Sequence, residues 1–540
     1  MQTAAATIRH VRQQASPTRN EMIAGTQATS GALHLQRWNG TSWSSEWTVT
    51  VADGSLPRFD IAYEQTSGDA LVVYTGNIVG GVGVTNELRY RTWNGASWSA
   101  EQNLDTLRTT GIVDAVDLES RPGSNDIGLA WGDRNFDLSA NLWDGTNSVW
   151  KTEPAAALAT DLTRMASATS LTHFSFDLSF ESVSGELVVG WGTNGASDPT
   201  FRKRTAGAGG AWAGSSVAGA AATEEVTDME LTADPNSNFI GYSDVTDGIV
   251  TATAISPDLE SGMWNGDTDT FGNVGGADAT AGLALAAGTN NVSSGWVRSG
   301  TEDRYVVVYE DTTAGINYTY FNKNTSLWTA APPDFTTAPS PLATKTMQRV
   351  RQNPNTQSEL MLVTIDSASD LFTKKLTFDG TNLTWANAEP GGVSPETSVS
   401  SVTGYAADYA FNKFIPTSVL EQSAYRWFQS GSAFDSDGVI DGAVATEAIT
   451  ASVIVGSSIY IVGETDAQDW RIEKRDLTTG ALVTAFDTDG IVDGAAATNL
   501  PNGVATDGTY LYVIGSDASA NWRIEKRDLT TGALVTAFDT

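Results

Sequence analysis

The chain has 540 residues and no cysteine, and its 64 Asp and Glu residues against 31 Lys and Arg give a formal net charge of −33. This acidic balance excludes nucleic acid and anionic membrane surfaces as expected partners, because both attract clustered Lys and Arg. The absence of cysteine excludes disulfides, thiolate metal sites and a cysteine nucleophile.

The N-terminal segment has no targeting signal of the usual kind. Residues 1–25 lack the apolar core of a signal peptide, and no stretch is apolar over the length of a bilayer, so no membrane insertion is expected. The 52 Gly and 17 Trp, among many Ser, Thr and Asn, favour a secreted protein of short strands and tight turns. We expect an extracellular or cell-surface protein whose signal sequence lies outside these residues; a cytosolic protein is the alternative.

Residues 59–104 show the unit that repeats along the first four-fifths of the chain. The strand-like segment "FDIAY" turns at Ser67-Gly68-Asp69 into the apolar run "ALVVY", and "ELRYRTWNGASWSAEQ" then forms an outer hairpin through Asn94-Gly95. The apolar run predicts an inner strand that is packed on both faces. Each unit therefore predicts four antiparallel strands, as in a blade of a β-propeller.

Such units recur about every 50 to 60 residues. Seven are clear and a shorter eighth lies between Pro395 and Gln429, so the sequence predicts an all-β fold with a seven- or eight-bladed β-propeller over residues 1–430. The matching openings "IRHVRQQ" and "MQRVRQN" indicate that the first residues already belong to a blade. An open solenoid is the alternative, but it would leave sheet edges exposed.

Paired tryptophans recur at the outer hairpins. Their indole faces could stack on sugar rings, or they could be cross-strand pairs that stabilise each hairpin. Their regular recurrence favours the structural interpretation. The candidate ligand-binding residues are Trp38, Trp43, Trp93, Trp98, Trp143 and Trp150.

The sequence singles out no catalytic group. The three histidines, His10, His34 and His173, match no Ser or Asp motif and are not spaced as metal ligands. A glycosidase needs two facing carboxyl groups, and with 64 acidic residues any pair could be nominated. We therefore expect a protein that is not an enzyme.

After Phe434 the consensus changes to a 52-residue period, and "WRIEKRDLTTGALVTAFDT" occurs identically at 470–488 and 522–540. Each repeat predicts four strands, the last of them "ALVTAF". Two blades do not close a ring of the usual four to eight. Residues 431–540 thus predict an incomplete second propeller of about two four-stranded blades, and we expect the natural chain to continue beyond residue 540.

The same region contains two acidic loops, "FDSDGVIDG" and "FDTDGIVDG". Several carboxylates in a Gly-containing loop suit Ca²⁺, although no bidentate Glu completes the EF-hand pattern and D-x-D-G is also an ordinary turn. The candidate calcium ligands are Asp435, Asp437, Asp441, Asp487, Asp489 and Asp493.

Two families share short motifs with this chain. W-N-G-x-S-W at 38–43 and 93–98, and D-G-T-N-x-x-W at 144–150 and 379–385, resemble the Asp-box turns of sialidase-like and other sugar-associated propellers, with different spacing and with Asn for Asp in the first two. Residues 431–540 look like the delta-sixty repeats of large bacterial secreted proteins, which share F-x-x-D-G-x-V and a strand ending in R-x-D. The resemblance implies a bacterial or archaeal secreted β-propeller repeat protein, in which Asp-box residues are mostly structural.

Identical repeats build a rigid body or a row of equivalent weak sites rather than one asymmetric catalytic site. We therefore expect a noncatalytic extracellular or cell-surface repeat protein that serves as an adhesion or structural scaffold, with glycans or other surface proteins as partners. Two alternatives stay open. A carbohydrate-binding propeller predicts Trp side chains facing pockets between blades, and a sialidase-like or other propeller enzyme predicts one axial pocket with convergent Arg, Glu and Tyr.

Overall fold

The computed structural model describes residues 8–538 apart from 41, 52–55, 77–87, 105–111, 155, 164–173, 197, 208, 215, 220–224, 248–257, 276–291, 311–315, 330–344, 354–355, 367–370, 388–404, 411–412, 419–427, 430–447, 465–469, 478–480, 488, 494–500, 517–518 and 520. The chain forms two compact units, Met1–Ser430 and Gly431–Thr540. Within the described part, no helix has the length and apolar character needed to cross a membrane.

The described strands of the first unit form eight antiparallel sheets, each with its strands in sequence order. The first four sheets consist of β1 (Ile8–Ala15), β2 (Met22–Ala28), β3 (Ala32–Trp38), β4 (Trp43–Thr50); β5 (Phe59–Tyr63), β6 (Ala70–Thr75), β7 (Leu88–Trp93), β8 (Gln102–Leu104); β9 (Val113–Ser120), β10 (Asp126–Asp133), β11 (Leu138–Asp144), β12 (Val149–Trp150); and β13 (Phe176–Phe180), β14 (Leu187–Trp191), β15 (Thr200–Arg204), β16 (Val217–Ala218).

The next four sheets consist of β17 (Glu225–Ala233), β18 (Phe239–Asp247), β19 (Asp258–Asn265), β20 (Thr270–Gly275); β21 (Val292–Ser299), β22 (Glu302–Glu310), β23 (Ile316–Asn322), β24 (Leu327–Trp328); β25 (Lys345–Gln352), β26 (Glu359–Asp366), β27 (Leu371–Phe378), β28 (Leu383–Asn387); and β29 (Tyr405–Ala410), β30 (Lys413–Ser418), β31 (Phe428–Gln429). The eighth sheet has three described strands, and the other seven have four.

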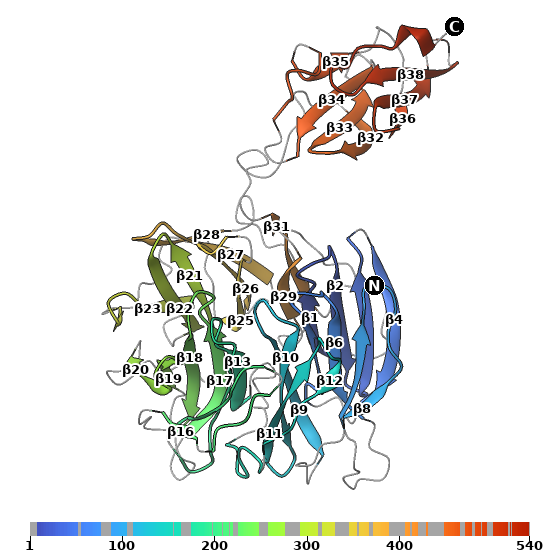
Figure 1. The fold of residues 1–540 in the computed structure, drawn as a ribbon. Helices are drawn as coiled ribbons and strands as arrows, with labels where there is room; N and C mark the ends of the chain where they lie inside the picture. Colours follow the sequence, from blue (N-terminus) through green and yellow to red (C-terminus); the bar gives the residue numbers. More distant parts are fainter. Residues whose placement is uncertain are drawn as a thin grey trace. The chain divides into compact units, whose positions relative to one another are not determined.

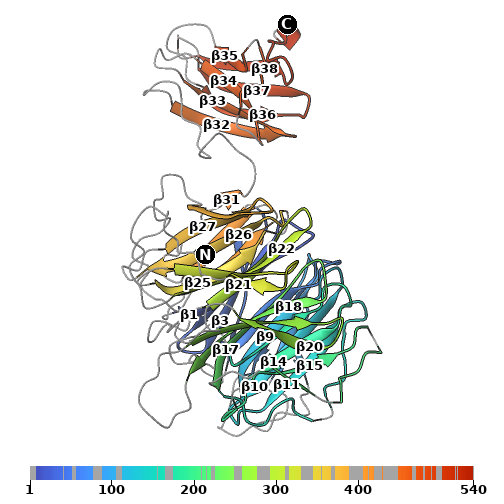
Figure 2. The same cartoon turned by 90° about the vertical axis from the view of Figure 1, so that its left-hand side faces the viewer.

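The first strands of neighbouring sheets lie side by side and form a closed ring. Each first strand contacts the next, from β1 through β5, β9, β13, β17, β21 and β25 to β29, and β29 contacts β1 again. Figures 1 and 2 show the sheets arranged around this ring as the blades of a β-propeller. The all-β propeller predicted from the sequence is therefore confirmed, with eight sheets among the described residues of the first unit.

The hydrophobic core lies between adjacent blades. Between the first two, Ile23 packs with Phe59 and Tyr63, and further clusters recur at the following interfaces. The close fit is visible at Gly25, where an added Cβ would lie 2.2 Å from the Phe59 ring. The apolar runs such as "ALVVY" are the buried second strands, as β6 shows. This confirms the predicted inner strand that is packed on both faces, and the strand before each run is the one that faces the axis.

The described residues of the second unit form two sheets. The first consists of β32 (Ala448–Val455), β33 (Ser458–Glu464), β34 (Trp470–Asp476) and β35 (Ile491–Asp493), and the second of β36 (Pro501–Thr506), β37 (Tyr510–Ser516) and β38 (Trp522–Asp528), followed by the 3₁₀ helix η2 (Thr536–Phe538). The segment "ALVTAF" does not form the predicted fourth strand. Only Leu482 and Leu534 make single bridges, to Arg475 and Arg527, because the chain then turns to bring Phe486 into the core.

Candidate functional site

A cavity of about 380 Å³ lies on the axis of the first unit. Among the residues whose side chains are described, those of β1, β5, β9, β13, β17, β21 and β25 line it. Its described lining has an acidic and a basic side, because carboxyl groups come from the second to fifth blades and arginines from the first and seventh. These residues are Asp60, Asp117, Glu119, Asp177, Glu230, Arg12 and Arg351.

Asp60, on β5, is held by its neighbours in the adjacent blades. Its Oδ2 accepts a hydrogen bond from the backbone N of Leu118 at 2.9 Å, and its Oδ1 lies 3.7 Å from Nε of Arg12. Burial raises the pKa of Asp60 from 3.8 to about 7, and Asp117 adds to this rise while Arg12 opposes it. Near neutral pH, this carboxyl is therefore poised between its neutral and charged forms.

Asp177, on β13, occupies the corresponding position two blades further on. Its Oδ2 accepts a hydrogen bond from the backbone N of Leu231 at 2.6 Å, and its side chain also hydrogen-bonds with Asp117. Burial raises the pKa of Asp177 well above its usual range, and the neighbouring Asp117 raises it further. The carboxyl groups of Asp117 and Asp177 therefore lie together in the lining of the cavity.

These two contacts belong to a pattern that links first strands around the ring. In the sixth and seventh blades, Ser293 Oγ accepts from the backbone N of Val350 at 2.9 Å. The axial carboxyl groups are not among the site residues predicted from the sequence. A signal was available in the polar second position of "FDIAY" and "FDLSF", two otherwise apolar segments that each precede an apolar run.

The cavity satisfies part of what the enzyme alternative predicts. Arg and Glu converge on one axial pocket, but its described lining includes no Tyr. Two adjacent carboxyl groups, of which Asp177 has a raised pKa, are an arrangement that general acid and base catalysis uses. The same groups can also donate and accept hydrogen bonds to the hydroxyl groups of a ligand without reaction.

The predicted tryptophans form three cross-strand pairs. Ring centroids lie 5.9 Å apart in the pair Trp38–Trp43, 5.5 Å in Trp93–Trp98 and 5.3 Å in Trp143–Trp150, and each pair is in strand register. Trp93 and Trp143 are buried, and the other four are half-buried. This placement supports the structural interpretation, and ligand binding by these residues stays a prediction.

The turn residues of the Asp-box-like motifs accept hydrogen bonds from the backbone of their own turns. Asn94 Oδ1 accepts from the backbone N of Ala96 and Ser97, at 3.0 and 2.8 Å. Asp379 Oδ1 accepts from the backbone N of Thr381 and Asn382, at 2.8 and 2.7 Å. Backbone hydrogen bonds from Asn382 and Thr381 lower the pKa of Asp379. These side chains are therefore parts of turns.

The calcium prediction stays a prediction. Asp435, Asp437 and Asp441 lie outside the described residues. Asp487 and Asp489 are exposed, and Asp489 Oδ1 accepts from the backbone N of Ile491 at 3.0 Å, as in an ordinary turn. Asp493 lies at the end of β35.

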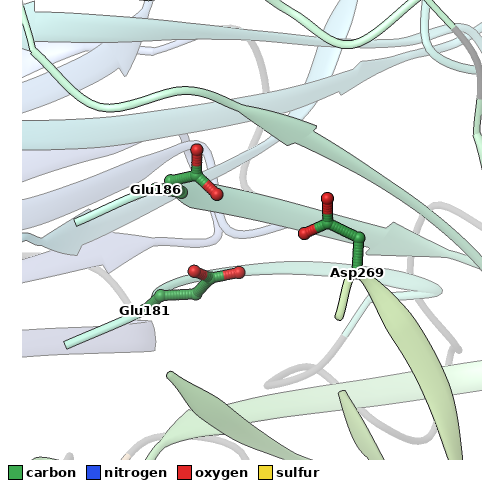
Figure 3. A group of neighbouring side chains, drawn as sticks. All are labelled: Glu181, Glu186 and Asp269. Carbon is green, nitrogen blue, oxygen red and sulfur yellow. The ribbon is translucent and has the colours of Figure 1, made fainter. Parts of the chain in front are cut away.

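Elsewhere, Glu181, Glu186 and Asp269 form a group in which carboxylate oxygens lie within 4.8 Å of one another (Figure 3). A cation of the chain already lies among them, because Lys203 Nζ donates to Glu186 at 2.7 Å and to Asp269 at 2.6 Å. Glu181 in turn accepts from Trp264 Nε1 at 2.9 Å. The group is thus a contact between the fourth and fifth blades.

Replacing Lys203 with methionine is expected to destabilise the first unit by about 1 kcal/mol, because two carboxylates would face each other without a cation. Urea denaturation of the full chain measures this loss. The control, Lys203→Arg, keeps the charge and should restore most of the stability. Equal stability of the methionine variant and the wild type would contradict a role for this contact.

Sequence reasoning also missed a second inter-blade contact, between a glutamate after a first strand and a tryptophan at the end of a third strand in the following blade. Trp93 Nε1 donates to Glu21 at 3.0 Å and Trp143 Nε1 donates to Glu64 at 2.9 Å. Trp264 and Glu181 repeat the contact. The spacing of E-x-x-S-G in "YEQTSG" and "FESVSG" was the available signal.

No protein-family model matches the sequence, and no curated protein matches it. The resemblances to Asp-box turns and delta-sixty repeats therefore rest on short motifs alone. The fold is similar to that of the BP39L lectin from Burkholderia pseudomallei, with 12% identity, a TM-score of 0.47 and coverage of 72% of this chain and 99% of that chain.

Two further solved structures are similar at 10% identity. The polysaccharide lyase Uly1 has a TM-score of 0.39 and coverage of 72% of this chain and 91% of that chain. A mutant of the Aleuria aurantia lectin, in complex with alpha-methyl-L-fucoside, has a TM-score of 0.33 and coverage of 70% of this chain and 96% of that chain. Similarity at this level concerns the fold, so function is inferred below from the site itself.

Proposed function

We propose that this chain is a noncatalytic extracellular binding protein whose first unit takes a hydroxyl-rich ligand, a short segment of a glycan, in the axial cavity. The observation that supports the proposal is the polar lining of that cavity. Carboxyl groups, two arginines and the amides of Gln13, Gln14 and Gln352 surround a space of about 380 Å³. This volume lies within the range of small-molecule sites.

The lining suits a sugar in particular because it presents acceptors and donors side by side. The carboxyl oxygens of Glu and Asp accept from hydroxyl groups, whereas the guanidinium groups of Arg12 and Arg351 donate. The apolar side chains of Val11, Leu118 and Leu231 also line the cavity and suit the C–H faces of a ring. The indoles of Trp93 and Trp143 are buried and donate to glutamates of the preceding blade, so the axial cavity supports glycan binding better than these two side chains do.

Binding of the purified full chain to a broad glycan array, followed by calorimetry on any hit, tests the proposal. Asp117→Asn changes one oxygen to an amide in the cavity and is expected to weaken binding about tenfold or more, because a hydrogen bond to a charged group contributes about 1.5 to 3 kcal/mol.

Asp269→Asn is the matched control, since it makes the same chemical change outside the cavity, and its affinity should equal that of the wild type. A blank array, or a hit whose affinity Asp117→Asn leaves unchanged in a folded protein, would contradict glycan binding in the cavity.

A glycan-cleaving enzyme is the second candidate, and the adjacent Asp117 and Asp177 carboxyl groups favour it. Mass spectrometry of each bound glycan after incubation with the chain distinguishes the two candidates. Intact glycans support the noncatalytic proposal. Cleavage that is lost in Asp177→Asn, while binding is retained, would replace it with an enzyme.

A further inference from the structure

The two identical segments of the second unit have opposite environments. In the first repeat, Trp470 and Ile472 of β34 are 2% and 0% exposed. In the second repeat, Trp522 and Ile524 of β38 are 82% and 41% exposed. The first face is called the covered face (Val462, Trp470, Ile472, Phe486), and its equivalent is called the open face (Ile514, Trp522, Ile524, Phe538).

The sheet β36–β38 lies on the covered face. Its side chains Leu511, Val513 and Leu529 are buried in one cluster with Trp470 and Phe486. Polar contacts fix this packing, because Tyr460 Oη and Lys474 Nζ both donate to the backbone O of Leu529, at 2.6 and 2.8 Å. The apolar face of the first repeat is therefore covered by the sheet of the second repeat. The packing surface is called the seating face (Leu511, Val513, Leu529).

The open face has the same local arrangement without this partner. Lys526 Nζ lies 5.5 Å and 5.9 Å from the rings of Tyr512 and Phe538, and Lys474 Nζ lies 5.3 Å and 5.9 Å from the equivalent rings. Tyr512 Oη donates instead to Asp507 within its own sheet, at 2.8 Å. The open face is thus already shaped like the covered one.

The first repeat carries the equivalent of the seating face. Counting back 52 residues from Leu511, Val513 and Leu529 leads to Ile459, Ile461 and Leu477, and all three are half-buried apolar side chains. The second repeat therefore presents the open face, on which a sheet can pack. The first repeat presents the equivalent of the seating face, which can pack on such a face.

We propose that the open face binds the first repeat of a second copy of this chain, through Ile459, Ile461 and Leu477 of that copy. Within one chain, β36–β38 packs on the first repeat in the same way. Tyr512 Oη and Lys526 Nζ then have the backbone O of Leu477 in the second copy as acceptor. The contact joins two different surfaces, so it leaves a free surface at each end and builds head-to-tail chains of molecules.

Charge opposes this association at low salt, since each copy has a formal net charge of −33. Salt screens this repulsion and leaves the apolar contact intact. Sedimentation velocity of the full chain over a range of concentrations, at low salt and at about 0.5 M NaCl, is therefore the measurement. We expect species larger than the 57.0 kDa monomer that increase with both concentration and salt.

Two variants test the surfaces separately. Trp522→Glu blocks the open face and Ile459→Glu blocks the opposite surface, so each variant alone is expected to associate at least tenfold more weakly than the wild type. A one-to-one mixture of the two retains one intact pair of surfaces, so it should form dimers and nothing larger. Leu327→Glu, at a 65% exposed apolar residue of the first unit, is the control and should associate like the wild type.

Circular dichroism and thermal melting confirm that each variant is folded before it is compared. A wild-type chain that remains monomeric at every concentration and salt would overturn the proposal. So would a folded Trp522→Glu variant that associates like the wild type, or a mixture of the two variants that forms no dimers.

Discussion

Replacement of Glu21 with alanine is expected to destabilise the first unit by about 3 to 5 kcal/mol, the range observed when one partner of a buried charged contact is removed. Glu21 is 5% exposed and accepts from Trp93 Nε1 at 3.0 Å and from Tyr63 Oη at 3.2 Å. It also pairs with Arg19 at 3.2 Å and Arg37 at 3.6 Å. Its loss would leave two buried donors and two cations without this acceptor.

Calorimetric or urea unfolding of the full chain measures this loss. Glu21→Gln retains one acceptor oxygen and should be destabilised less than Glu21→Ala. In a double-mutant cycle with Trp93→Phe, which removes the N–H donor, a coupling of about 1 to 3 kcal/mol is expected. Additive effects of the two substitutions would show that this hydrogen bond does not join the first two blades.

The pH dependence of stability should show the second large effect, at Asp60. Burial raises its pKa from 3.8 to about 7, so the folded chain binds more protons than the unfolded chain between these two values. Stability contributed by this group is therefore greatest below about pH 4, falls as pH rises to about 7, and is level above it. A change of one in pKa corresponds to about 1.4 kcal/mol, so the fall reaches about 4 kcal/mol at most.

The substitution Asp60→Asn isolates this contribution. The amide keeps an oxygen for the backbone N of Leu118 but has no charge at any of these pH values. The variant should have nearly wild-type stability at about pH 4 and should exceed it by up to several kcal/mol at about pH 8. The measurement is urea denaturation of both proteins across this pH range.

Asp379→Asn serves as the control for the pH series, because Asp379 lies on an exposed turn where backbone hydrogen bonds lower its pKa. Its ionised form is favoured by folding, so its contribution is lost as pH falls, opposite in sign to that of Asp60. If the curve of Asp60→Asn ran parallel to that of the wild type, the axial carboxyl would not be responsible for the loss of stability.

The turns were the part of the blade most directly predictable from the sequence. Gly68 and Gly95 have φ values of 75° and 87°, in the left-handed region where glycine is favoured, at the two turns predicted within residues 59–104. Turn residues and apolar runs determine structure over only a few neighbouring residues, so each turn and each strand could be predicted from its own short segment. The predicted strand over "ALVTAF" was wrong. A short apolar segment can form a strand, or it can bend so that its last side chain enters the core, and the local pattern does not distinguish the two.

The sequence by itself determined the repeating unit, the all-β propeller fold and the change of repeat after Phe434, because these depend on local patterns that recur along the chain. Only the tertiary structure decided that Asp60, Asp117 and Asp177 meet on the axis, since each comes from a different blade. Burial and the neighbouring Asp117 raise the pKa of Asp60 and of Asp177, and neither cause can be read from a local pattern. Trp470 and Trp522 lie in identical segments, yet one is buried and the other exposed. No local pattern distinguishes them, because the environment of each is set by whether another sheet packs on it.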